Sequence, residues 1–220
     1  MQVDPGTSAG TAFRRILVLA PHTDDGEFGC GGTIARYAEG GSDVFYATFS
    51  LCEESVPSEF PRNILEMEVR EATAALGIPP ANLIIYRYPV RRLPEVRQDI
   101  LENLIQLKKE IDPDLVLLPS KYDLHQDHNQ VAMEGLRAFK DRCLMGYEVP
   151  WNNLIFQTLA FVLLEERHVQ KKIEALACYR SQSSKLYADP EYIRGLARTR
   201  GVEIGSRFAE CYEVMRWVLR

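Results

Sequence analysis

Two short segments hold the residues best suited to chemistry in this chain. The first is Pro21-His22-Thr23-Asp24-Asp25-Gly26-Glu27 and the second is Tyr122-Asp123-Leu124-His125-Gln126-Asp127-His128. Together they contain three of the four histidines of the protein, each with carboxylates nearby. Histidine and carboxylate side chains at such spacing are typical of a catalytic metal site, in which three protein ligands leave one position for water.

The spacing within each segment indicates how such a site would be assembled. His22 and Asp25 are three residues apart, so both side chains can turn toward one ion. The third ligand then comes from the other segment, as His125 or His128, which lie about one helical turn apart. Asp24 is left over, and a carboxylate in that place can take a proton from bound water. In a purely structural interpretation, Asp24 and Asp25 only cap a helix.

These residues also resemble those of a known family. His-x-Asp-Asp-x-Glu, the glycine-rich stretch Gly29-Cys30-Gly31-Gly32-Thr33 and the later His-x-Asp-His resemble the LmbE/PIG-L family of zinc-dependent N-acetylglucosaminyl deacetylases. Thr23 stands where the family usually has proline. Weaker similarities extend the resemblance from about Arg15 to the C-terminus.

The resemblance implies a role for each residue. The implied zinc ligands are His22, Asp25 and His128. Asp24 would be the general base, His125 would stabilise the oxyanion or act as an acid, and Asp127 would orient a neighbouring histidine.

The resemblance also implies the reaction. It is hydrolysis of a linear amide, the N-acetyl group of a glucosamine-containing conjugate, with Zn2+ as the cofactor. In the family an arginine on the second helix often contacts substrate, but Leu65 occupies that position here. Arg62, one turn earlier, is the expected substitute in substrate binding.

Alternation of short apolar runs with segments of helical period predicts the elements that position these residues. Strands are expected over 16–20, 44–49, 83–88, 115–118, 154–164 and 212–219. Helices are expected over 27–39, 64–76, 96–111, about 129–141 and 169–179. This order predicts a Rossmann-like three-layer α/β/α sandwich with a mostly parallel sheet. Ligands bind such folds outside the carboxyl ends of the strands, where both segments fall.

The domain organisation is expected to be simple. Residues 1–13 are interpreted as a flexible lead-in without signal-peptide features, and residues 14–220 as a single domain. The loops over 51–63, 89–95 and 143–153 are expected to set substrate selectivity. His168 is expected at the surface, and Trp151 in the core, with a sugar platform as the alternative for Trp151. Arg91 and Arg92 are interpreted either as a clamp for a phosphate or sugar nucleotide or as part of a solvated loop.

Composition excludes several classes of protein. Twenty-six basic and 31 acidic residues give a net charge of −5, which argues against nucleic acid as a partner. The longest mostly apolar run, Leu154–Leu164, is too short for a membrane span and is expected to be a buried element. Five scattered cysteines indicate free thiols and a cytoplasmic location. The sequence leaves a homo-oligomer open.

Two other functions are compatible with parts of the sequence. A nucleotide-binding α/β protein would use Gly29–Gly32 as a phosphate loop, but the third glycine of the dinucleotide fingerprint is replaced by Ile34. An iron(II) oxygenase also uses two histidines and one carboxylate. Asp24 and the spare His125 favour hydrolysis, because hydrolysis needs proton transfer on both sides of a tetrahedral intermediate.

Overall fold

The computed structural model describes residues 13–219, and within them seven strands form one sheet. The strands are β1 (Arg15–Ala20), β2 (Asp43–Thr48), β3 (Leu83–Ile85), β4 (Leu115–Pro119), β5 (Cys143–Tyr147), β6 (Ala160–Leu164) and β7 (Phe208–Arg216). Their order across the sheet is β3-β2-β1-β4-β5-β7-β6. The first five strands in that order run parallel, and β7 is antiparallel to both β5 and β6.

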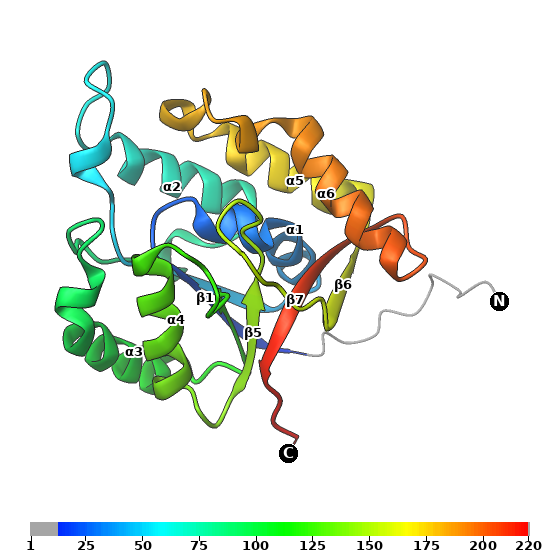
Figure 1. Ribbon diagram of the computed structural model, residues 1–220, viewed down its shortest axis with the longest axis horizontal. Coiled ribbons are helices and arrows are strands. Elements are labelled where there is room, and N and C mark those ends of the chain that lie inside the picture. The colour runs from blue at the N-terminus through cyan, green and yellow to red at the C-terminus, as the bar shows by residue number, and fades with distance from the viewer. Residues whose placement is uncertain (1–12, 220) are drawn as a thin grey trace.

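Helices cover both faces of the sheet (Figure 1). They are α1 (Asp25–Glu39), α2 (Ile64–Ala75), α3 (Arg97–Ile111), α4 (Gln126–Ala138), α5 (Glu166–Ala177) and α6 (Pro190–Glu203). Ile16 and Val18 of β1 pack with α1 and α2, whereas Leu17 and Leu19 pack with α3 and α4. A central parallel strand is therefore apolar on both faces, and the predicted three-layer sandwich is confirmed.

The neighbouring strands β1 and β4 position the two chemical segments. They pair in parallel, with Ile16 opposite Leu115 and Val18 opposite Leu117. Because parallel strands end at the same edge of a sheet, the loop after Ala20 and the loop after Pro119 meet there. Residues about 100 positions apart in the chain are thus brought into one site.

Helix α1 contains a break that a distant carboxylate stabilises. Cys30 has φ −147° and ψ 23°, outside the helical range. Just beyond it, the backbone N–H groups of Gly32 and Thr33 donate to the Glu210 carboxylate, at 3.0 and 2.7 Å. Lys172 Nζ lies 2.7 Å from the same carboxylate, so this buried charge is both paired and hydrogen-bonded.

The glycines of α1 are required by close packing. Gly29 to Gly32 are all buried, and a Cβ added at Gly29 would lie 2.2 Å from the Tyr147 ring. A phosphate loop needs accessible backbone N–H groups, whereas those of Gly32 and Thr33 are taken by Glu210. Gly29–Gly32 therefore do not form a phosphate loop, and this argues against the nucleotide-binding alternative.

Two elements were missed by the sequence prediction. The expected selectivity loop 143–153 is wrong in its first part, because Cys143–Tyr147 form β5, a fully buried strand inside the sheet. Gly146 weakens its strand signal, yet a Cβ there would lie 2.6 Å from Met215 Cε. Helix α6 carries Gly195 and Gly201, and glycine disfavours helix.

The predicted strand over 154–164 is wrong in its first half. Only Ala160–Leu164 form a strand, at the edge of the sheet, and Leu154 is 78% exposed. The expected buried element is therefore an exposed loop followed by an edge strand. The last strand begins four residues earlier than predicted, at Phe208, because it pairs with β6 along its first half.

Three further expectations concern membrane spans, the N-terminal segment, and the location and assembly of the protein. No helix within residues 13–219 is long and apolar enough to cross a membrane. The expected lead-in lies outside the described residues except for Phe13, whose ring packs against Tyr37 and Trp217. The cytoplasmic location and the oligomeric state stay predictions.

A glycine substitution tests the packing of α1. Gly29→Ala should lower the free energy of unfolding by about 1–3 kcal/mol, because the new methyl group overlaps the Tyr147 ring. Gly195→Ala is the matched control, since nothing lies within 4 Å of a Cβ at this helical position. Denaturant unfolding of both variants measures the difference, and equal stabilities would contradict the packing argument.

Candidate active site

The first functional loop turns sharply between β1 and α1. The backbone N–H of His22 donates to Asp25 Oδ2 at 2.8 Å, which closes the turn over three residues. Asp24 is the N-cap residue of α1, but its side chain makes no capping hydrogen bond. The capping interpretation of Asp24 therefore does not hold, and its carboxylate lines a cavity instead.

The second functional loop leads into α4. His125 is the N-cap residue, and its Nδ1 accepts the backbone N–H of Asp127 at 3.1 Å. His128 follows in the first helical turn and is buried. An acceptor role for Nδ1 places the hydrogen of a neutral His125 imidazole on Nε2.

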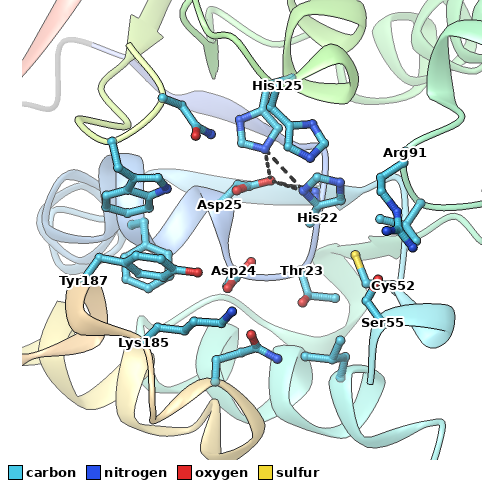
Figure 2. A pocket seen from close by; sticks show the side chains of 17 residues that line it. His22, Thr23, Asp24, Asp25, Cys52, Ser55, Arg91, His125, Lys185 and Tyr187 are labelled. Atoms are coloured by element: carbon cyan, nitrogen blue, oxygen red, sulfur yellow. Dashed lines mark hydrogen bonds and ion pairs between the residues drawn. The ribbon is translucent and has the colours of Figure 1, made fainter. Parts of the chain in front are cut away.

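Three atoms from the two loops converge (Figure 2). The distances between His22 Nδ1, Asp25 Oδ2 and His128 Nε2 are each 3.2 Å. Donor atoms bound at about 2.0–2.1 Å to a tetrahedral zinc ion lie about 3.3 Å apart. These three side chains therefore form a trio that fits one metal ion without rearrangement.

A second trio contains the three histidines His22, His125 and His128. Their nitrogen atoms lie within 4.8 Å of one another. Two ligands at about 2.1 Å from one ion are at most about 4.2 Å apart. The trio with Asp25 is tighter, so we assign His22, Asp25 and His128 as the candidate metal ligands and leave His125 facing the cavity.

Each histidine of this trio has a carboxylate behind it. His22 Nε2 lies 3.0 Å from Asp127 Oδ2, and His128 Nδ1 lies 2.8 Å from Asp123 Oδ2. Such carboxylates fix the ring orientation of metal-binding histidines and raise their basicity. Asp127 thus orients the histidine of the other loop. The sequence does not predict the role of Asp123, because spacing within one loop does not show which carboxylate reaches His128.

The carboxylates also govern the charges of the site. Burial lowers the pKa of His22, but Asp25 and Asp127 outweigh it and raise the pKa to about 9. Burial also lowers the pKa of His128, but Asp25 and Asp123 outweigh this effect and raise the pKa to about 10. Burial raises the pKa of Asp25, but the two histidines lower it well below its usual value. The two histidines and the Asp25 carboxylate therefore stabilise each other's charged forms.

Asp24 has different surroundings. Burial and the neighbouring charge of Asp25 raise its pKa to about 6, although His22 opposes them. In Figure 2 its carboxylate lies beside Asp25 and points into the cavity. Asp24 is therefore a carboxylate close to the trio that takes no part in it.

Buried tyrosines hold the first loop in place. The hydroxyls of Tyr46 and Tyr179 lie 2.9 and 2.6 Å from the Thr23 carbonyl oxygen, and both contact the Glu27 carboxyl group. Burial raises the pKa of Glu27 to about 8, so at neutral pH this group carries a proton. A protonated Glu27 can donate to one hydroxyl and accept from the other, and the hydroxyl that accepts stays free to donate to the Thr23 carbonyl oxygen.

The trio opens into a cavity of about 400 Å³. One wall is aromatic: the Trp151 and Tyr187 rings stack with centroids 4.1 Å apart, and Phe28 meets both edge-on. Trp151 is 41% exposed, so its expected place in the core is wrong. Arg91 and Lys185 are the cationic side chains of the lining.

The structure does not bring every predicted residue to the site. Arg62 is exposed and absent from the cavity lining, whereas Leu65 lies in it, so the predicted contact of Arg62 with substrate has no geometric support. His168 is buried rather than at the surface: it forms a capping box with Glu165 and contacts Glu39. Tyr187 and Lys185 were missed because they follow no motif.

The fold and the trio together define an α/β/α protein with a candidate metal centre at the carboxyl edge of its sheet. The sequence model of the PIG-L family, described as GlcNAc-PI de-N-acetylase, matches residues 17–139. That range includes both functional loops and more than half of the chain. The chain therefore belongs to the PIG-L family of deacetylases.

The chain is less than 30% identical, over the aligned residues, to each of the individual relatives described next. The chain is 25% identical over 182 residues to the uncharacterized deacetylase YaiS of Escherichia coli, covering 79% of this chain and 95% of that protein. It is 29% identical over 134 residues to diacetylchitobiose deacetylase of Thermococcus kodakarensis, covering 57% of this chain and 49% of that one. The crystal structure of the conserved protein TT1542 from Thermus thermophilus superposes with TM-score 0.79 and 26% identity, covering 93% of this chain and 96% of that one.

The carboxylate behind His128 provides a test of the candidate metal centre. Asp123→Ala should weaken the binding of Zn2+ about 10- to 100-fold, because the His128 ring loses its orienting partner. Competition with a chelator of known affinity measures the change. Asp99→Ala, at an exposed position on α3, is the control. Equal affinity in the two variants would contradict the role of Asp123.

Proposed function

We propose that this protein is a zinc-dependent hydrolase that removes the N-acetyl group from a glucosamine-containing conjugate. The observation that carries the proposal is the trio of His22, Asp25 and His128, with donor atoms 3.2 Å apart and Asp24 beside it. A cavity large enough for a sugar opens directly onto these residues.

The donor set supports zinc. Two imidazole nitrogens and one carboxylate oxygen leave a coordination position open, as catalytic zinc sites require. Carboxylates support both histidines from behind. An ion held there would lower the pKa of a water molecule and polarise the acetyl carbonyl group.

Asp24 is suited to be the general base of the reaction. Its carboxylate faces the cavity and is not used for helix capping. It accepts a proton from the attacking water and returns it to the nitrogen atom of the leaving amine. The products are acetate and a free amine, so water supplies every atom that is added.

His125 is suited to stabilise the oxyanion. Its Nδ1 accepts a hydrogen bond from the Asp127 N–H, which leaves Nε2–H as the donor. Burial and the neighbouring charges of His22 and His128 lower the pKa of His125. These contacts favour a neutral imidazole that donates a hydrogen bond, rather than an imidazolium that gives up a proton.

The relatives support the class of substrate. The family description and the diacetylchitobiose deacetylase both concern N-acetylated sugars. A hydrolase also explains Asp24 and His125 better than an iron(II) oxygenase, which uses the same kind of trio but has no need of a general base beside it.

The general base is tested by one substitution. Asp24→Asn should keep bound zinc but lower kcat about 10²- to 10⁴-fold, because the amide cannot accept the proton of water. Metal analysis and release of acetate from N-acetylglucosamine derivatives measure the two effects. His128→Ala is the contrasting variant and should lose the metal itself. Turnover near the wild-type level in Asp24→Asn would refute the assignment.

The metal is tested by removing it. Chelation should abolish acetate release, and Zn2+ should restore it at one ion for each chain. The restored rate should be equal in air and under nitrogen, since hydrolysis consumes no oxygen. Full activity after complete chelation would rule out metal dependence, and a requirement for oxygen would favour the iron(II) alternative.

A further inference from the structure

The loop after β3 holds an arginine in an unusual backbone conformation. Arg91 has φ 65°, a left-handed value that is uncommon for residues other than glycine. Asp127 holds the loop there: its Oδ2 accepts the N–H of Arg91 at 2.6 Å, and its Oδ1 accepts the N–H of Leu93 at 3.1 Å. Gln126 Nε2 donates to the carbonyl oxygen of Arg91 at 3.3 Å. Strained backbone that is held so firmly is typical of functional positions.

The side chain of Arg91 belongs to the cavity and has no ionic partner. Within residues 13–219 its guanidinium makes no ion pair, whereas the adjacent Arg92 pairs with Glu95 at 2.7 Å. Figure 2 shows Arg91 on the side of the trio opposite Tyr187. The cavity therefore has an aromatic wall on one side and a free guanidinium on the other.

Arg91 is one of two lysine or arginine side chains among the described residues that line the cavity. The part of α2 that reaches the cavity contributes Leu65, which is apolar, and Arg62 stays outside. Lys185 is the other cation of the lining, and both it and Arg91 are exposed, so exposure does not distinguish them. The backbone of Arg91, by contrast, is tied to the carboxylate that also orients His22. Of the two cations, Arg91 is thus the one whose backbone shares a hydrogen-bond partner, Asp127, with a candidate metal ligand.

We propose that Arg91 binds an anionic group, a carboxylate or a phosphate, on the part of the substrate beyond the amino sugar. The proposal rests on the function proposed above and narrows its substrate class to negatively charged conjugates. A planar guanidinium donates two parallel hydrogen bonds to either anion, and the acetyl group itself is neutral. Arg91 would act on substrate affinity and selection, and Asp24 would act on the chemical step.

Three matched substrates test the inference. They are the methyl glycoside, the carboxymethyl glycoside and the 1-phosphate of N-acetylglucosamine, of which the first is neutral. We expect wild-type protein to prefer at least one anionic substrate by about 10- to 100-fold in kcat/KM, mainly through KM. The two anionic compounds distinguish a carboxylate from a phosphate. Raising NaCl from about 0.05 to 0.5 M should reduce the preference.

Substitutions locate the preference. Arg91→Gln should remove most of it, and Arg91→Lys should keep a part, because lysine retains the charge but not the paired donors. Both variants retain the backbone N–H that Asp127 binds. Arg92→Gln is the control and should keep the wild-type preference, since that side chain pairs with Glu95 outside the cavity.

The outcomes separate this inference from the proposed function. Equal kcat/KM for all three substrates in the wild type, or an unchanged preference in Arg91→Gln, would refute the role of Arg91 and leave the deacetylase proposal standing. Absence of acetate release from every substrate by zinc-loaded protein would refute both. If Arg91→Gln does not fold, Arg91→Lys provides the test: a preference equal to that of the wild type would refute the role of the paired guanidinium donors.

Discussion

The buried carboxylate of Asp127 is the contact on which the geometry of the site depends. It accepts hydrogen bonds from His22 Nε2, in the loop after β1, and from the N–H groups of Arg91 and Leu93, in the loop after β3. Asp127 itself lies in the first turn of α4, so its carboxylate joins three segments of the chain. A fully buried carboxylate is stable only when its oxygens are satisfied. Moving one loop away would leave the buried carboxylate without a partner, which is unfavourable in free energy. The positions of these loops therefore depend on one another.

The same principle recurs around the site. Asp123 supports His128, and Glu27 contacts the two tyrosine hydroxyls that lie within hydrogen-bond distance of the Thr23 carbonyl oxygen. Glu210 binds the broken helix α1 while pairing with Lys172. Each buried charge or polar group has found several partners from distant elements. A site built in this way is rigid, because no partner can move without leaving another buried group unsatisfied. Such rigidity suits a metal centre, whose ligands must keep their separation.

Much of the fold and of the candidate site was predictable from local signals. The apolar runs of β1 and β4 and the helical periods between them were sufficient for the three-layer sandwich. The signals failed where local preference opposed tertiary need. Gly146 weakened β5 and Gly195 weakened α6, although packing favours both elements. Exposure of Trp151 and burial of His168 were equally hidden, because both depend on residues far away in the chain.

The sequence by itself determined the chemistry available: which histidines and carboxylates exist, how they are spaced within each loop, and that both loops follow strands of a parallel sheet. Only the tertiary structure decided which of them meet. It brings His128, which the family resemblance implied, within 3.2 Å of His22 and Asp25. It also pairs Asp127 with His22, leaves Arg62 outside the cavity and places Arg91 in the lining. The physical reason is that spacing within a loop is a local property, whereas the contact between loops about 100 residues apart follows from strand order and packing.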